Sequence, residues 1–247
     1  LMVRWKADSL SRLGRKLRIT FAVSVLAGAV AAFAMPAFHW SAWLAVTLAS
    51  WITLSSLQNL YDRVAARQDK VRALVEMPLG FYGMTLAHIG VAVFIVGITL
   101  TSVYSQEKDV RLATGQQYNI GGYDFEFRGV QPFTGENYRA DEGVFAIYQN
   151  GELIAQLHSQ KRLYNAGGMP MTEAGIDAGL FRDLYVSLGE PLDETAWSVR
   201  LYYKPFIRWI WLGALFMAAG GLLAAMDRRY RMTLKPEQAD TVTAGAA

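Results

Sequence analysis

Residues 81–103 read FYGMTLAHIGVAVFIVGITLTSV, a run of 23 residues without Asp, Glu, Lys or Arg. About 20 apolar residues in a helix are enough to cross the hydrocarbon core of a bilayer, so this run predicts a transmembrane helix. One ionisable residue, His88, interrupts it near its start. The rest of the chain can be arranged on either side of this helix.

Three other apolar stretches are long enough, or nearly so, to form further spans. They are Ile19–Phe38, Ala42–Leu57 and Ile207–Met226. The first two are separated by a short turn containing Pro36 and His39, as in a helical hairpin. The composition agrees with a membrane protein, because 53% of the residues are hydrophobic, 18% are charged and the mean hydropathy is +0.17.

The basic residues indicate which side of the membrane each segment occupies. Segments 1–18, 61–80 and 227–247 contain 14 of the 24 Lys and Arg residues and 7 of the 21 acidic residues. Residues 104–208 contain the other 10 basic residues and 14 acidic ones. Because Lys- and Arg-rich segments stay in the cytoplasm, we expect both ends there and residues 104–206 on the outer side.

The expected organisation therefore has seven parts. They are a basic cytoplasmic segment (1–18), a transmembrane hairpin (19–60), a cytoplasmic loop (61–80), the His88 helix (81–103), an outer β-domain (104–206), a last transmembrane helix (207–226) and a cytoplasmic tail (227–247). An alternative reads the first span as a signal peptide cleaved near Ala32-Phe33-Ala34, but its apolar run is longer than a typical signal core. The chain begins with Leu1 ahead of Met2, which suggests a fragment of a longer protein.

The outer segment carries the sequence patterns of β-structure. Residues Tyr123–Val130 alternate apolar and polar side chains, and Asn150-Gly151 supplies a type I′ turn between two apolar runs. Two further strands are predicted at Leu184–Leu188 and Trp197–Tyr203, with loops at Gly167–Pro170 and Gly189–Pro191. The fold class is thus an α+β membrane protein, with a barrel or sandwich of about six strands inserted between the third and fourth helices.

Several classes of function are excluded or disfavoured. The chain has no Cys, so any thiol chemistry must involve a partner. The pI near 9.1 comes from basic residues placed beside the membrane, so the expected partner is lipid and not nucleic acid. The outer segment shows no catalytic triad, nucleotide loop or metal cluster, and its acidic stretch Glu136–Glu142 is interpreted as a solvated loop.

His88 is the candidate binding residue. It lies seven residues after Phe81, about 10 Å into the span, where an ionisable side chain is costly and marks a functional site by default. Imidazole is a common axial ligand of haem iron. A proton relay or a structural hydrogen bond between helices are the alternatives.

The two sides of the His88 helix differ in side-chain size. At 100° per residue, a stripe with room for a flat group surrounds His88. The stripe consists of Phe81, Met84, Thr85, Val91, Ala92, Ile95 and Thr99. The opposite side carries the small residues Gly83, Ala87, Gly90 and Gly97, which let another helix approach closely.

The other residues considered for a functional role are weaker candidates than His88. His39 lies beside Trp40 in the outer turn, where interfacial anchoring is the more common role. His158 ends a predicted strand and is interpreted as a surface residue. Trp209 and Trp211 begin the last span, either as belt residues or as the lining of a cofactor cleft.

Several motifs resemble the C-terminal part of the CcmF family, the cytochrome c-type biogenesis haem lyases of bacterial inner membranes. One is the stretch Gly83-Met84-Thr85-Leu86-Ala87-His88-Ile89-Gly90 in the third span. The others occur in order along the outer segment: Asn150-Gly151, Lys161-Arg162-Leu163-Tyr164, Met171-Thr172-Glu173-Ala174, Arg182–Gly189 and Val199–Pro205.

This resemblance implies a function for the whole assembly. The family joins haem vinyl groups to the two thiols of a Cys-x-x-Cys-His motif in apocytochrome c. A periplasmic haem chaperone supplies the haem, and a thiol-handling maturation partner presents the substrate. Members also carry a permanent b-type haem in the membrane, thought to be reduced by quinol. His88 matches one axial ligand of that haem b.

The sequence also lacks parts that the resemblance would require. The tryptophan-rich haem-holding segment, its two histidines and the other b-haem ligand lie in the family's N-terminal part. The resemblance therefore implies a C-terminal portion that is inactive alone and completed by the N-terminal part. The alternatives are a membrane electron-transfer subunit with one haem ligand and a non-catalytic anchor for the β-domain.

Overall fold

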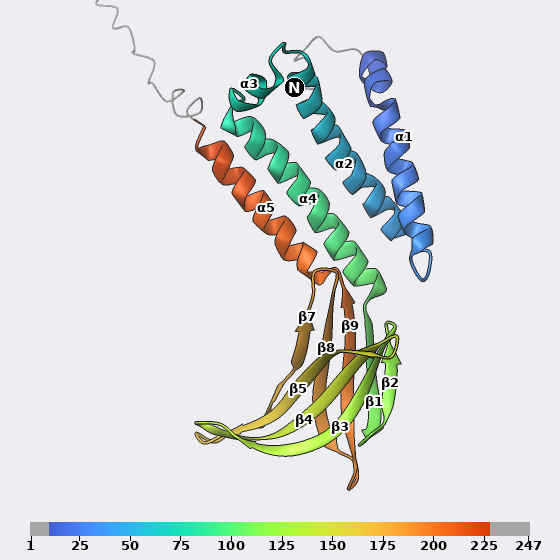
Figure 1. Ribbon diagram of the computed structural model, residues 1–247, viewed down its shortest axis with the longest axis vertical. Helices are drawn as coiled ribbons and strands as arrows, with labels where there is room; N and C mark the ends of the chain where they lie inside the picture. The colour runs from blue at the N-terminus through green and yellow to red at the C-terminus, as the bar shows by residue number, and fades with distance from the viewer. Residues whose placement is uncertain (1–9, 228–247) are drawn as a thin grey trace, which may run out of the picture.

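The computed structural model describes residues 10–227, as a helical part joined to a β-domain (Figure 1). The helices are α1 (Leu10–Ala34), α2 (Trp40–Ala65), α3 (Lys70–Val75), α4 (Leu79–Tyr104) and α5 (Ile207–Ala225). All but the six-residue α3 are long and apolar enough to cross a membrane. The four expected spans are therefore confirmed, although segment 1–9 and the tail beyond residue 227 lie outside the described residues.

The helices differ in extent from the expected spans, and α1 already begins at Leu10, inside the expected basic segment 1–18. α2 continues to Ala65, which makes the short second span a helix of 26 residues. The segment expected as a loop also contains α3, whose first turn is capped by the Asp69 side chain accepting a hydrogen bond from the Arg72 N–H. Such a cap satisfies one of the free backbone donors at a helix start.

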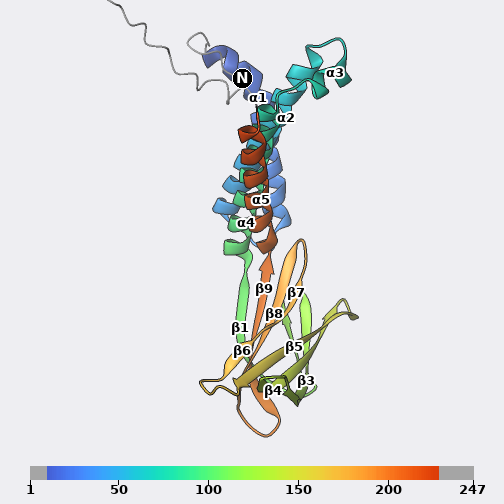
Figure 2. The ribbon, with the colours of Figure 1, turned by 90° about the vertical axis from the view of Figure 1, so that its left-hand side faces the viewer.

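The four long helices form a single layer. They lie side by side in the order α1, α2, α4, α5 in Figure 1, and they overlap in one narrow column in Figure 2, which is turned by 90°. In each spanning window only 11% to 22% of the residues are buried. Both faces of the layer are therefore open to lipid or to other polypeptide.

α4 and α5 make the closest contact in this layer, through glycines. A Cβ added at Gly83 would lie 2.4 Å from the Gly220 carbonyl oxygen, and one at Gly90 would lie 2.7 Å from the Met217 nitrogen. A Cβ at Gly213 would lie 2.6 Å from the Phe94 nitrogen. The backbones touch because no side chain separates them, which confirms the small-residue track expected on α4.

Both ends of this helix pair are fixed by hydrogen bonds. At one end, the buried Asp227 carboxylate accepts a hydrogen bond of 2.8 Å from the Gly80 N–H, in the first turn of α4. A carboxylate at a helix N-terminus also interacts favourably with the helix dipole. At the other end, the Thr101 hydroxyl donates to the Pro205 carbonyl oxygen at 2.7 Å.

The two helices continue directly into two paired strands. One residue, Ser105, separates α4 from β1 (Gln106–Ala113), and Phe206 separates β9 (Ala196–Pro205) from α5. β1 and β9 are antiparallel and paired from Gln106 opposite Tyr203 to Ala113 opposite Ala196. The helix pair thus extends into the β-domain as a strand pair (Figure 1).

The β-domain is a sandwich of two antiparallel sheets. The remaining strands are β2 (Gln117–Ile120), β3 (Tyr123–Thr134), β4 (Tyr138–Gln149), β5 (Glu152–Tyr164), β6 (Met171–Glu173), β7 (Gly175–Ala178) and β8 (Arg182–Pro191). One sheet has the order β1-β9-β8-β7 and the other β2-β3-β4-β5-β6. The core between them contains the fully buried Phe125, Phe127, Phe145, Leu184 and Leu201.

The expected strands are present, with two corrections. The described residues contain nine strands and not about six. β1 was not recognised from its sequence, and β2, β6 and β7 have only three or four residues. The expected loop Gly189–Pro191 belongs to β8, where the pairing with β9 shifts register between Leu188 and Pro191. The hairpin turn at Asn150-Gly151 is confirmed, with φ of 52° and 82°.

The adjacent glycines of α5 provide a test of the helix contact. A Cβ at Gly220 would lie 2.5 Å from the Gly83 carbonyl oxygen, whereas one at Gly221 would meet nothing within 4 Å. We expect Gly220→Ala to lower the stability by about 1–3 kcal/mol, because the overpacked backbones must separate. Thermal unfolding of the purified protein in detergent measures the effect.

Gly221→Ala is the matched control for that substitution. It is expected to leave the midpoint unchanged or to raise it slightly, because alanine has the higher helix propensity. Equal midpoints for the two variants would contradict the proposed role of the Gly220 contact.

Candidate functional site

His88 lies on α4 with its side chain exposed within this chain. Its Nδ1 is 2.7 Å from the carbonyl oxygen of Met84, one helical turn earlier. A carbonyl oxygen only accepts, so a neutral ring in this contact carries its proton on Nδ1. Nε2 then keeps its lone pair, and such a fixed tautomer is the form of histidine that binds metal ions.

The stripe around His88 is divided by the neighbouring helix. Phe81, Thr85 and Ala92 are buried within the chain, whereas Met84 and Val91 are exposed beside His88. Arg63 of α2 lies 4.3 Å above the Phe81 ring. The stripe is therefore only partly open within this chain, because α2 packs against α4 on that side. The open part is narrower and still apolar.

A separate groove lies within the helical layer. It has a volume of about 400 Å³ and its lining includes Ala27 of α1, Ala49 of α2, Ala92 of α4 and Trp209 of α5. His88 is not part of this lining. The groove and the His88 side chain are therefore separate features of α4.

His39 stabilises the turn between α1 and α2. Its ring meets the Tyr104 ring edge-on, with 5.5 Å between the centroids. The Tyr104 hydroxyl also donates a hydrogen bond of 2.8 Å to the Ala37 carbonyl oxygen. These contacts attach the hairpin turn to the end of α4, so a structural role accounts for His39.

His158 contacts a carboxylate that the sequence did not single out. Its Nδ1 is 3.1 Å from Oε1 of Glu142, which is only 6% exposed. The amides of Gln160 and Gln131 donate to the same carboxylate at 2.5 and 2.9 Å. The interpretation of Glu136–Glu142 as a solvated loop is wrong at Glu142, because that residue lies within β4 and is enclosed by these groups.

These contacts keep Glu142 ionised. The hydrogen bond from Gln160, with those from Gln131 and His158, lowers the pKa of the carboxyl below its ordinary value of 4.5 and outweighs the opposing effect of burial. A group of this kind stabilises the fold above the unfolded pKa, and the contribution is lost as the pH falls through the lowered folded pKa.

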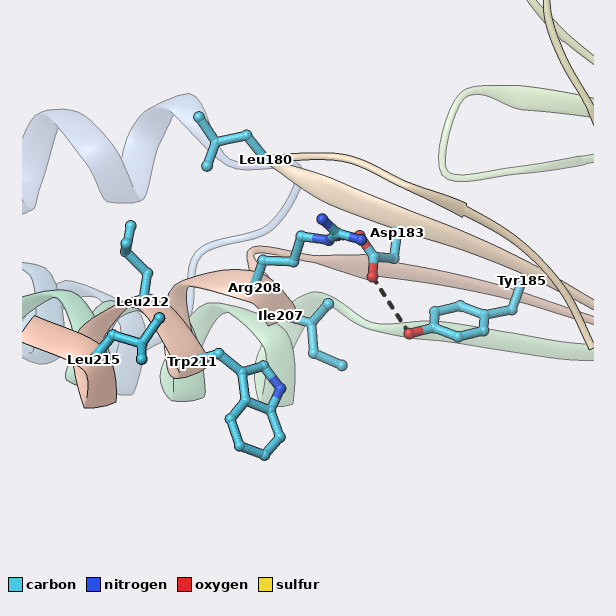
Figure 3. Close-up of a pocket in the computed structure, with 8 residues that line it drawn as sticks. All are labelled: Leu180, Asp183, Tyr185, Ile207, Arg208, Trp211, Leu212 and Leu215. Carbon is cyan, nitrogen blue, oxygen red and sulfur yellow. Dashed lines mark hydrogen bonds and ion pairs between the residues drawn. The ribbon is translucent and has the colours of Figure 1, made fainter.

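A pocket lies where the β-domain meets α5 (Figure 3). This boundary pocket has a volume of about 460 Å³ and is lined chiefly by Asp183, Tyr185, Arg208, Trp211, Leu212 and Leu215. Asp183 is 5% exposed, and its Oδ1 lies 3.3 Å from Nε of Arg208. No pattern in the sequence indicated this pair, because its members are on different elements and 25 positions apart. Trp211, expected either as a belt residue or as the lining of a cofactor cleft, lines this pocket.

The three histidines occupy separate elements: α4, the α1–α2 turn and β5. Within residues 10–227, no group of three or more His, Cys, Asp or Glu side chains is placed to hold a metal ion. His88 is exposed on a membrane-length helix, and its Nε2 is left open by the contact of Nδ1 with the Met84 carbonyl oxygen. An open imidazole nitrogen of this kind is able to bind a metal ion.

Comparison with known proteins agrees with this architecture. Residues 103–205 match a family model described as the CcmF C-terminal beta-sandwich. The whole chain is also 42% identical over 247 residues to the cytochrome c-type biogenesis protein CcmF of Pseudomonas fluorescens. The chain belongs to the CcmF family. The resemblance found in the sequence motifs is thereby confirmed.

Other CcmF proteins show similar agreement. The CcmF proteins of Pseudomonas aeruginosa and Escherichia coli are 43% and 39% identical over 95% and 96% of this chain. A solved structure titled Cytochrome c Heme Lyase CcmF matches 91% of the chain with a TM-score of 0.69. At 19% identity, that structure supports the fold alone. The chain spans 36% to 37% of the length of these proteins.

The Glu142 cluster gives a prediction for pH-dependent stability. We expect Glu142→Gln to lower the free energy of unfolding by about 1–3 kcal/mol at neutral pH, because the buried Gln160 amide loses a charged acceptor. The deficit should shrink as the pH falls from 4.5 through the lowered pKa of the folded carboxyl, because the wild type then loses the stabilisation from its ionised Glu142. Unfolding followed by near-UV circular dichroism between pH 3 and pH 7 measures this.

The control is Asp141→Asn, at the neighbouring exposed position of β4. It should leave the stability nearly unchanged across the same pH range, since surface substitutions usually have small effects. A pH-independent deficit in Glu142→Gln would refute the proposed contribution of the ionised carboxylate.

Proposed function

We propose that this chain is the C-terminal portion of a cytochrome c haem lyase subunit, in which His88 supplies one axial ligand to a b-type haem in the membrane. The observation that carries the proposal is the His88 geometry. The ring is exposed on a membrane-length helix, and its Nδ1 is held by the Met84 carbonyl oxygen. Family membership provides the context, because the relatives are named for cytochrome c-type biogenesis.

The chain's own residues have a positioning role in this proposal. The hydrogen bond to Met84 fixes the orientation and the tautomer of the ring, so that Nε2 is the nitrogen left to bind. The exposed Met84 and Val91 would contact the edge of the macrocycle and keep water away from it. When bound, haem supplies one-electron redox chemistry that no side chain of this chain can provide.

The proposed orientation follows the distribution of basic residues. Both ends of the chain are cytoplasmic, and the β-domain lies in the periplasm of a bacterial inner membrane. There, the β-domain would meet a haem chaperone, a thiol-handling partner and apocytochrome c. The chain has no Cys, so the thiols that react with haem vinyl groups come from apocytochrome c.

The remaining N-terminal part of the lyase completes the site. It would supply the second axial ligand and the segment that holds the incoming haem, with quinol as the source of electrons. The open faces of the helical layer offer the surface on which that part can pack. Alone, this chain should bind haem weakly and form no thioether bonds.

The first test is the reduced-minus-oxidised visible spectrum of the purified full-length assembly. His88→Ala should lose most of the b-type signal, because one axial ligand is removed. Added imidazole should restore the signal if the helix is still folded. His39→Ala is the matched control, since His39 is another exposed histidine of the helical part, and it should keep the wild-type spectrum.

An unchanged spectrum in His88→Ala would contradict the ligand assignment. That result would favour the second candidate, a non-catalytic anchor for the β-domain. The direct connections from α4 to β1 and from β9 to α5 are the feature that favours such an anchor.

A further inference from the structure

The boundary pocket lies at the first turns of α5, directly after the end of β9. Arg208 is the second residue of α5, and α5 begins one residue after β9 ends. The polar wall, Asp183 and Tyr185, belongs to β8, while the apolar wall belongs to the membrane-length α5 (Figure 3). The pocket therefore lies at the junction between the β-domain, which is exposed to water, and the transmembrane helix α5.

The charged end of the pocket is fixed in position. The Asp183 carboxylate accepts hydrogen bonds from the Gly179 N–H at 3.0 Å and from the Tyr185 hydroxyl at 3.4 Å, and its Oδ1 pairs with Nε of Arg208. Burial and the adjacent Asp183 charge raise the pKa of Tyr185, so its hydroxyl stays protonated. Both carboxylate oxygens of Asp183 therefore have a partner within the protein.

Arg208 keeps donors that face outward. Its side chain is 51% exposed, and its contact with Asp183 uses Nε. A guanidinium has five N–H donors in a rigid fork, so the terminal nitrogens remain able to bind an oxyanion. Phosphate is an oxyanion whose geometry suits this fork.

Below Arg208, α5 presents an apolar stripe. Trp211, Leu215 and Leu222 are 73%, 66% and 67% exposed. Their spacing of three, four and seven residues keeps them on the same helical face as Arg208. The stripe extends about 21 Å along the helix, from the charged end into the hydrocarbon region.

We propose that the boundary pocket binds a phospholipid, with the phosphate on Arg208 and the acyl chains along Trp211, Leu215 and Leu222. In a diacyl phospholipid a charged head is followed by apolar tails, just as Arg208 is followed along α5 by the apolar stripe. A second protein helix at this position would have to bury the Arg208 charge, which is costly unless it is paired. A free phosphate ion would leave the apolar stripe uncovered.

Photo-crosslinking of the full-length assembly in native membranes tests the occupant directly. The variant is Trp211→p-benzoylphenylalanine, and Leu192→p-benzoylphenylalanine, at a 54% exposed position in the β8–β9 turn, is its control. We expect a phospholipid mass added to the peptide containing position 211 and none at position 192. A crosslink from position 211 to polypeptide, or the absence of a lipid adduct, would overturn the proposal.

A second experiment tests the phosphate contact. Native mass spectrometry of the delipidated assembly would be titrated with phosphatidylglycerol, with diacylglycerol of the same chains and with glycerol 3-phosphate. Arg208→Gln should weaken phosphatidylglycerol binding about tenfold, which corresponds to one charge-assisted contact. Arg208→Lys should retain part of it.

The control is Arg111→Gln, which alters an equally exposed arginine that is paired with Asp193. It should bind like the wild type. Glycerol 3-phosphate should bind neither protein tightly, because it has no acyl chains. Equal phosphatidylglycerol affinity in Arg208→Gln and wild type, or equal affinity for diacylglycerol and phosphatidylglycerol, would overturn the assignment of the phosphate to Arg208.

Discussion

The contact between the α4 and α5 backbones is the constraint on which the other parts depend. Gly83 and Gly90 of α4 face Gly220 and Gly213 of α5, and Gly97 lies against the Trp209–Ile210 backbone. No Cβ fits at any of these glycines without displacing backbone. This contact fixes the rotation of α4 about its own axis. It also brings β1 and β9 together at the base of the sandwich.

The same rotation determines what His88 faces. Gly90 is about 160° from His88 around the helix, so close packing on the glycine side directs His88 away from α5. α2 then covers one flank of the His88 stripe, leaving Met84, His88 and Val91 exposed. The face that carries these three side chains is therefore open within this chain, which spans little more than a third of the length of its relatives.

Features with local causes could be predicted from the sequence. Long apolar runs predicted the four spans, Asn150-Gly151 predicted its turn, and the glycine spacing predicted the face used for close packing. The features that were missed join distant parts of the chain. Burial of Glu142 requires Gln160 from β5, and the boundary pocket requires Arg208 of α5 beside Asp183 of β8. The hydrophobic periodicity of one segment cannot show which residue of a distant segment will contact it.

The glycine contact also has a consequence for the order of events during synthesis. Gly83 and Gly220 are separated by the entire β-domain, so the first helix of the pair leaves the ribosome long before its partner exists. At about 5–20 residues per second, this delay is about 7–27 s. During that time the bare glycine groove of α4 faces lipid or a membrane chaperone. The pair can therefore close only after all the sandwich strands have been synthesised.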